Sequence, residues 1–411
     1  MAKALPVSPL ALPLPNLTTV PGVRLGAVAA GVRYTGRTDL MLMSFVEGTT
    51  VAGVFTRNKC SAAPIDWSRE ALKHGRARAL VVNSGNANVF TGQAGVTAVE
   101  ATASAAAEAV GCAANEVFLA STGVIGEKIA YHRIVDALPA LDAGLRDDAW
   151  ADTARAIMTT DTFPKAARRD TRIGNTPVRI QGIAKGSGMI APDMATMLAF
   201  VATDAAIPHE TLQSLLRDAT DSSFNCITVD SDTSTSDMVL LFATGQANNA
   251  SVSGPADPAL AEFVSALRSL MHELALMVVR DGEGATKMFS VRVTGAVSNE
   301  SAKRVALAIG NSPLVKTAIA GQDANWGRVV MAVGKAGEPA DRDRLSVAIG
   351  GTWIARDGSV VEGYDETPVV AHMKGQDIEI HADLGLGQGE ATIWTCDLTH
   401  GYIDINGSYR S

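Results

Sequence analysis

The chain has 411 residues, of which 47% are apolar and 19% are charged, with a formal net charge of −8. This length predicts two lobes, and this composition is typical of a well-packed globular protein. The acidic balance, without any basic run, argues against a nucleic-acid partner. No stretch reaches the ~18 consecutive apolar residues that cross a bilayer, so we expect no membrane partner either.

Cysteine spacing and the proline-rich N-terminus bear on the cellular location of the protein. The four cysteines are far apart and form no CxxC pair, which predicts neither a zinc site nor a disulfide framework and fits a reducing cytoplasm. Four prolines before residue 20 break the helix that a signal peptide needs. We therefore expect a cytoplasmic protein with an extended N-terminal arm on its surface.

In the first half of the chain, apolar runs alternate with turns. The alanine-rich stretch 97–111 is predicted to be a helix, because it closes on Gly111 as helices do. Short apolar runs that end in glycine or asparagine turns predict strands. These strands lie between residues 24 and 65 and at 79–88, 116–126, 178–189 and 196–205.

The second half continues the same alternation. Helical apolar spacing covers 209–225, 256–279, 301–310, 312–321 and 326–337, whereas strands are predicted at 287–297, 344–358, 377–398 and 401–410. The strands and helices are mixed without a strict strand–helix–strand repeat. The fold class is therefore α/β, with stacked layers as in a sandwich and not a doubly wound sheet.

Several familiar catalytic signatures are missing. The segment DLGLGQGEA at 383–391 contains GxGxG, but predicted strands flank it on both sides, so we interpret it as a hairpin turn and not a dinucleotide site. The sequence has no P-loop, no GxSxG elbow and no HExxH among its seven histidines. No metal site is predicted.

One glycine-rich segment, KGSGMIAPDMATMLAF at 185–200, breaks the rules for both helices and strands just before an apolar run. One interpretation is a tight loop that leads into a buried strand, with Thr196 in a structural role; on composition alone this is the commoner case. The other is chemical: a strained Ala195–Thr196 peptide would be attacked by the Thr196 hydroxyl. Cleavage would free an α-amine with a pKa of ~8 to serve as the base for that hydroxyl.

This segment closely resembles the self-cleavage segment of ornithine acetyltransferases, the bifunctional glutamate N-acetyltransferase family of arginine biosynthesis. Further motifs are similar to the family in the same order, from near residue 20 to the last residue. They are AGVFTRNKCSAAP, NSGNANVFTG, ASTGVIG, MTTDTFPK, SFNCITVDSDTSTSD, RDGEGATK, DANWGRVVMAVG and DLTHGYIDINGSYRS.

The resemblance implies a fold of two α/β lobes and an enzyme whose nucleophile is an N-terminal threonine made by self-cleavage. A cut between Ala195 and Thr196 would give an α chain, 1–195, with the oxyanion hole and the cleavage loop. The β chain, 196–411, would carry the nucleophile and the substrate-binding lobe. Two copies of each chain would associate as α2β2.

The resemblance also implies the chemistry. Thr196 would take an acetyl group from N2-acetylornithine and pass it to glutamate, in a ping-pong scheme through O-acetyl-threonine. Thr122 and Gly123 match the family's oxyanion-hole pair. The scheme needs no metal or organic cofactor, and it leaves open whether acetyl-CoA is a second co-substrate. The implied substrate contacts are Thr159 (chosen over its neighbour Thr160), Lys185, Thr196, Glu283, Asn406 and Ser411.

Two other classes of protein remain as alternatives. An N-terminal-nucleophile amidohydrolase would use the same threonine to pass the acetyl group to water, releasing free acetate. A cleavage-dead binding protein would keep the fold alone, but it is expected to have lost Thr196 or the oxyanion donors, which this sequence retains.

Overall fold

The computed structural model describes residues 6–33, 35–191 and 197–407. The chain divides into two compact units. The larger unit comprises residues 12–225 and 232–278, and the smaller comprises residues 1–11, 226–231 and 279–411. The predicted division into 1–195 and 196–411 marks where the peptide bond would be cut, which is a different property from the packing of the two units. This division stays a prediction.

Two β-sheets form the centre of the larger unit. The first has the order β1-β2-β4-β5, and only its last pair is parallel. The second has the order β3-β9-β8-β7-β6. The strands are β1 (Val23–Val28), β2 (Leu40–Phe45), β3 (Thr50–Phe55), β4 (Ala79–Asn86), β5 (Val117–Val124), β6 (Lys165–Ile173), β7 (Thr176–Lys185), β8 (Leu198–Thr203) and β9 (Met238–Ala243).

The two sheets pack face to face through alternate residues of their strands. In β2, Met41, Met43 and Phe45 belong to the core shared with the second sheet. The residues between them, such as Leu42, belong to a separate core on the opposite face of the first sheet. The ring of Phe45 stacks on that of Phe242 in β9, with 4.2 Å between centroids. Each such buried phenylalanine contributes roughly 1.5–3 kcal/mol.

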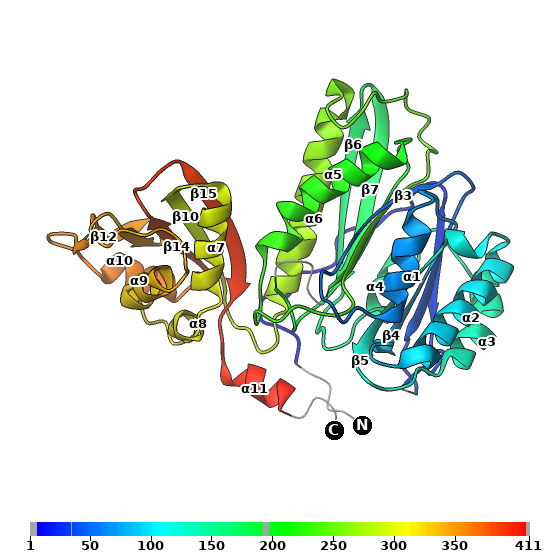
Figure 1. The fold of residues 1–411 in the computed structure, drawn as a ribbon, viewed down its shortest axis with the longest axis horizontal. Helices are drawn as coiled ribbons and strands as arrows, with labels where there is room; N and C mark the ends of the chain where they lie inside the picture. The colour runs from blue at the N-terminus through cyan, green and yellow to red at the C-terminus, as the bar shows by residue number, and fades with distance from the viewer. Residues whose placement is uncertain (1–5, 34, 192–196, 408–411) are drawn as a thin grey trace. The chain divides into compact units, whose positions relative to one another are not determined.

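Helices cover the outer faces of both sheets, as Figure 1 shows for α5 and α6. Against the second sheet, Gln213 of α5 bonds both the N–H and the carbonyl of Gly53 in β3 at 3.0 Å. The resulting helix–sheet–sheet–helix stack confirms the predicted layered α/β class. The helices are α1 (Ala63–Leu72), α2 (Gly92–Val110), α3 (Tyr131–Ala143), α4 (Trp150–Ala156), α5 (His209–Asp221) and α6 (Ala261–Arg280), with 3-10 turns η1 (Ala114–Glu116), η2 (Phe224–Cys226) and η3 (Pro258–Leu260).

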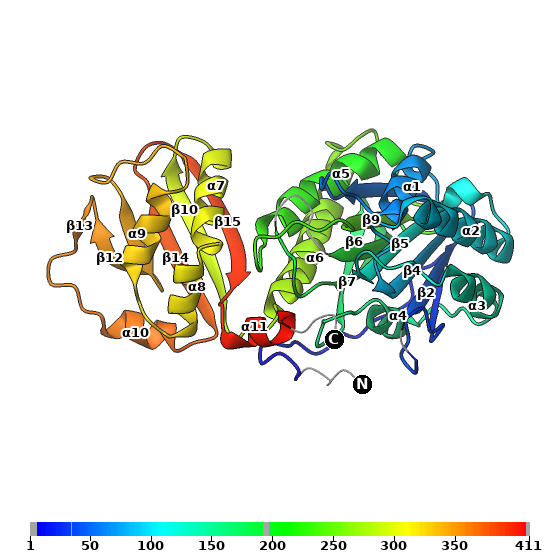
Figure 2. The same cartoon turned by 60° about the horizontal axis from the view of Figure 1, so that its bottom comes forward.

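The smaller unit is built on one sheet of order β13-β12-β11-β14-β10-β15, with α7, α8 and α9 packed against it (Figure 2). Its strands are β10 (Met288–Ala296), β11 (Ser346–Ile349), β12 (Thr352–Arg356), β13 (Ser359–Val360), β14 (Asp377–Asp383) and β15 (Gly389–Cys396). Its helices are α7 (Asn299–Gly310), α8 (Pro313–Ala320), α9 (Trp326–Gly334), α10 (Thr367–Met373) and α11 (His400–Asn406).

Two sequence-based assignments in this unit are wrong. The GxGxG segment at 383–391 is no hairpin, because β10 lies between β14 and β15. The connection instead passes over the end of β10, where Leu384 N–H and Leu386 N–H bond the carbonyls of Thr294 and Gly295. Glycines at this position let the backbones approach closely, which the hairpin interpretation did not foresee.

The last predicted strand, 401–410, is helix α11 over its described part. The alternation of apolar and polar residues in YIDI suggested a strand, but a helix cap precedes it. The Thr399 side chain accepts a hydrogen bond from the N–H of Gly401, which is the usual role of an N-cap threonine. The cap therefore outweighs the period-two pattern in a segment this short.

The N-terminal arm has neither helix nor strand over residues 6–20, as expected, but it is not wholly on the surface. Leu10 and Val20 are only 3% and 1% exposed. Within the larger unit, the Thr18 backbone pairs with the side-chain amide of Gln181 in β7. Buried apolar side chains thus anchor the arm, which its high proline content did not lead us to expect.

Candidate active site

Three strand ends meet where the central strand of the second sheet begins. β8 lies between β7 and β9, and its first residue, Leu198, is in register with both Lys185 and Met238. Met197, just before β8, donates its N–H to Asp237 Oδ1 at 2.7 Å and accepts from Met238 N–H at 3.2 Å. The residue that follows Thr196 is therefore held by hydrogen bonds from both of its peptide groups.

The predicted oxyanion residues lie against one of these strand ends. Lys185 Nζ donates to Thr122 Oγ1 at 3.1 Å, and both side chains are buried, at 2% and 3% exposed. Next to Thr122, Gly123 has a φ of +130°. A Cβ atom there would lie 2.3 Å from the carbonyl carbon of Gly85, so the close approach of β5 to β4 requires glycine.

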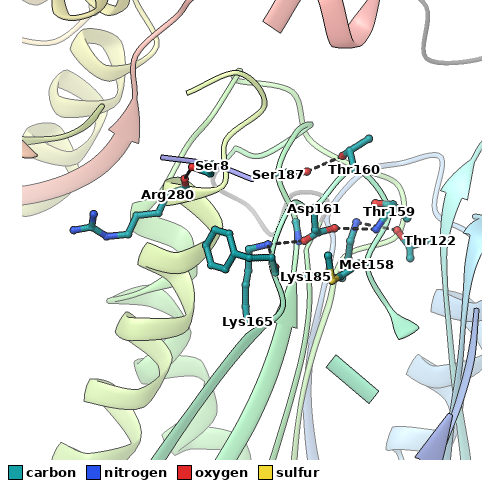
Figure 3. A network of polar contacts seen from close by, with 12 residues as sticks. Ser8, Thr122, Met158, Thr159, Thr160, Asp161, Lys165, Lys185, Ser187 and Arg280 are labelled. Carbon is teal, nitrogen blue, oxygen red and sulfur yellow. Dashed lines mark hydrogen bonds and ion pairs between the residues drawn. The ribbon is translucent and has the colours of Figure 1, made fainter. Parts of the chain in front are cut away.

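A buried carboxylate, Asp161, ties Thr159 of MTTD to the start of the glycine-rich loop (Figure 3). Its Oδ1 accepts from Lys165 Nζ and from Gly186 N–H, each at 2.7 Å, and its Oδ2 accepts from Thr159 N–H at 2.9 Å. Burial alone would raise the pKa of this carboxyl, but Lys165, Lys185 and the Gly186 N–H together hold it below its usual range. Asp161 is therefore an ionised anchor.

The two candidate threonines of MTTD occupy similar environments. Thr159 is half-buried and fixed through its N–H, and Thr160 Oγ1 shares a hydrogen bond of 2.6 Å with Ser187 Oγ (Figure 3). Both therefore lie beside the glycine-rich loop, and the choice of Thr159 as the substrate contact stays a prediction.

A second buried carboxylate, Asp237, differs from Asp161 in its surroundings. It is fully buried, and within the described part of the chain its Oδ2 has no hydrogen-bond partner. Burial raises the pKa of this carboxyl well above the usual value, a shift that the Met197 N–H and the charge of Lys185 only partly offset. Sequence reasoning missed both carboxylates, although each lies inside a motif that resembles the family, MTTD or SDTSTSD.

The smaller unit holds a second set of predicted residues. Asn406 Nδ2 donates to Glu283 Oε2 at 2.7 Å and to the carbonyl of Tyr402 at 3.1 Å. Glu283 is 8% exposed, whereas Asn406 is exposed at the end of α11. The structure thus brings together two of the predicted substrate contacts, which are 123 residues apart in the chain.

Three predicted site residues, Ala195, Thr196 and Ser411, lie outside the described residues. The roles of the described ones stay predictions. Within the described ranges, no group of three or more histidine, cysteine, aspartate or glutamate side chains is arranged to hold a metal ion. None of the helices over those same residues is both long and apolar enough to cross a membrane.

Fold and site together define a layered α/β protein with a buried, charged cluster at the start of a central strand. A family model described as the ArgJ family matches residues 24–411, and the chain belongs to that family. The family membership predicted from the sequence motifs is thereby confirmed.

Two relatives match this chain over nearly its whole length, and one solved structure matches about half of it. A protein of Gluconobacter oxydans named arginine biosynthesis bifunctional protein ArgJ is 72% identical over 411 residues, covering 100% of this chain and 97% of the relative. A protein of the same name from Brucella suis is 57% identical, covering 98% and 99%. The crystal structure of arginine biosynthesis bifunctional protein ArgJ from Bacillus halodurans is 43% identical over 51% of this chain and 98% of that chain, with a TM-score of 0.49.

Proposed function

We propose that the chain is an acetyltransferase of arginine biosynthesis that cuts itself between Ala195 and Thr196 and then moves the acetyl group of N2-acetylornithine to glutamate. Membership of the ArgJ family and the names of its relatives support the pathway. One structural observation carries the proposal furthest. The Lys185–Thr122 contact brings the predicted oxyanion donor to a residue that pairs with Leu198, two residues after the predicted nucleophile.

Self-cleavage would begin with attack of the Thr196 hydroxyl oxygen on the carbonyl carbon of Ala195. The acyl group moves from nitrogen to oxygen as the C–N bond breaks, and water then hydrolyses the ester. The products are a carboxylate on Ala195 and a free α-amine on Thr196. That amine can remove the proton from the hydroxyl of the same threonine, so no other base is needed.

In the transfer reaction, the Thr196 oxygen attacks the acetyl carbonyl of N2-acetylornithine. Negative charge develops on the carbonyl oxygen, where the Thr122 hydroxyl and the Gly123 N–H would stabilise it. The tetrahedral intermediate then collapses and expels ornithine, whose nitrogen takes up the proton that the α-amine had accepted from the hydroxyl. O-acetyl-threonine remains. The amine of glutamate then attacks this ester. Its proton passes through the Thr196 amine to the leaving Thr196 oxygen, so N-acetylglutamate departs and the hydroxyl is restored. The scheme is therefore ping-pong, and the threonine is the acyl carrier without a metal or organic cofactor.

Two charged side chains would contact the substrates. Lys185 offers a cation to a substrate carboxylate, and Glu283 offers an anion to a substrate ammonium. Thr159, Asn406 and Ser411 would complete the set. We further propose that the two products of cleavage associate as α2β2 and act in the cytoplasm.

The relatives are called bifunctional. This name supports a second activity in which acetyl-CoA supplies the acetyl group to glutamate through the same threonine. Acetyl-CoA would then be a co-substrate and not a bound cofactor.

An isotope experiment tests the proposal. The purified chain is incubated with N2-acetylornithine labelled in its acetyl group, with and without glutamate, and a parallel sample receives labelled acetyl-CoA. Labelled N-acetylglutamate that forms only with glutamate would establish the transferase. Labelled free acetate at the same rate without glutamate would contradict it and favour the amidohydrolase.

A further inference from the structure

One buried hydrogen bond joins two residues to which the proposed mechanism gives separate roles. Lys185, the last residue of β7, donates from Nζ to Oγ1 of Thr122 in β5 at 3.1 Å (Figure 3). The two residues are 2% and 3% exposed, so little water competes for this contact. The predicted substrate contact and the predicted oxyanion donor are therefore bonded to each other within the larger unit.

The direction of this hydrogen bond decides where the Thr122 hydroxyl can donate. An ammonium group has no lone pair, so Lys185 is the donor and Thr122 Oγ1 is the acceptor. A hydroxyl that accepts through its oxygen still has one hydrogen to give to another acceptor. Among the residues that the structure describes, none accepts that hydrogen. Thr122 therefore holds a buried donor that a bound substrate can use.

The charges around Lys185 favour its ammonium form. The carboxylate of Asp161 lies in the same network, and the charge of Lys185 helps to hold the pKa of that carboxyl below its usual range. The interaction is mutual, so the Asp161 anion favours the charged form of Lys185. A hydroxyl that accepts a hydrogen bond from a cation is polarised, and it becomes a stronger donor through its own hydrogen.

We propose that Lys185 acts through Thr122: its ammonium group directs the hydroxyl hydrogen toward the carbonyl oxygen of the substrate and strengthens that hydrogen bond as negative charge develops. Lys185 is then a positioning residue of the oxyanion hole. The inference rests on the proposed function. No bond forms or breaks between the lysine and the threonine. An ammonium group has three N–H bonds, so the contact with Thr122 does not exclude a contact with a substrate carboxylate.

A double-mutant cycle tests this role. Acetyl transfer from N2-acetylornithine to glutamate is measured at saturating substrate in the wild type, Lys185→Met, Thr122→Val and the double variant, and intact mass gives the cut fraction of each. We expect Lys185→Met alone to lower kcat by about 10–100-fold, less than removal of the donor itself. In the Thr122→Val background, the same change should alter kcat by less than about threefold, because the hydroxyl is already absent.

Two outcomes would overturn the inference. If Lys185→Met lowers kcat equally in both backgrounds, the lysine acts on the substrate directly and not through the threonine. If it raises KM and leaves kcat unchanged, the lysine is a substrate contact alone. Thr122→Ser is the conservative variant, and because it keeps the hydroxyl, the sensitivity of kcat to Lys185→Met should return there. Absence of cleavage or transfer in the wild type itself would instead refute the proposed function.

A matched control shows whether the loss of any buried lysine has the same effect. In the smaller unit, Lys316 Nζ donates to Thr395 Oγ1 at 2.9 Å, and the two residues are 4% and 0% exposed. Lys316→Met thus removes a similar contact that includes no predicted site residue. Its kcat should stay within about twofold of the wild type. A loss of kcat equal to that of Lys185→Met would contradict the inference.

Lys185→Gln decides the matter if Lys185→Met does not fold. The glutamine amide can donate to Thr122 but carries no charge, so kcat should fall less than in Thr122→Val. If neither variant of Lys185 folds or is cut, whereas Thr122→Val does both, the inference fails. The lysine would then be needed for the fold itself and would not act through the threonine.

Discussion

The buried cluster of the larger unit and the half-exposed pair of the smaller unit hold their polar groups in different ways. In the larger unit, Thr122, Lys185 and Asp161 are each less than a tenth exposed. Lys185 donates to Thr122, and Asp161 accepts several hydrogen bonds. In the smaller unit, Asn406 is exposed on a seven-residue helix and contacts one carboxylate. The first arrangement suits chemistry that needs fixed geometry, and the second suits contacts that a substrate can replace.

The largest effect that separates the two regions should follow from Asp161→Asn. It would leave Lys165, whose side chain is 0% exposed, without its buried counter-ion. Breaking such a pair costs about 3–5 kcal/mol in the free energy of unfolding. The control is Asp377→Asn in the smaller unit, which breaks the Arg280–Asp377 pair, where the aspartate is 59% exposed. There we expect less than about 1 kcal/mol. Urea-induced unfolding measures both, and equal losses would contradict the contrast.

The same variant makes a prediction about pH. Because the folded-state pKa of Asp161 lies below its ordinary value of 3.8, the carboxylate contributes stability above that value and loses it as the pH falls further. The difference in stability between wild type and Asp161→Asn should therefore shrink as the pH is lowered below about 4. A difference that grows on acidification would show that Asp161 is not held ionised.

Thr122→Val should affect activity far more than stability. Loss of one oxyanion donor typically lowers kcat by about 10²–10³-fold. The matched control is Thr153→Val, since Thr153 is equally buried but bonds only carbonyls of its own helix region, those of Ala149 and Trp150. Initial rates of acetyl transfer and thermal melts of both variants make the comparison. Equal kcat in the two variants would remove Thr122 from the oxyanion hole.

The smallest effect is expected for Asn406→Ala in the smaller unit. Its exposed amide supports Glu283 but fixes no core group. We expect KM to rise by up to about tenfold, the equivalent of about 1.4 kcal/mol, with kcat within about twofold. A large fall in kcat with unchanged KM would mean that the pair takes part in the chemistry, which would break the contrast between the two units.

Local patterns in the sequence predicted most strands and helices because apolar spacing and terminal glycines report on burial directly. They failed where contacts between segments distant in the sequence, or a helix cap, determined the secondary structure. The crossing of β10 between β14 and β15 leaves no local mark at 383–391, and the Thr399 cap outweighed the alternation that follows it. Motif resemblance predicted roles for Thr122 and Lys185, which the structure brings into contact, but it did not single out Asp161 or Asp237. Their importance lies in burial and partnership, which a linear sequence does not display.

The central claim is that the chain makes its own nucleophile, and intact mass tests it most directly. The purified wild type and Thr196→Ala are compared under denaturing conditions. We predict two wild-type fragments, each about half of the 42.7 kDa chain, with the second beginning at Thr196, and a single full-length mass for the variant. A single full-length mass from both proteins would contradict the account, because Thr196 would then have no free amine.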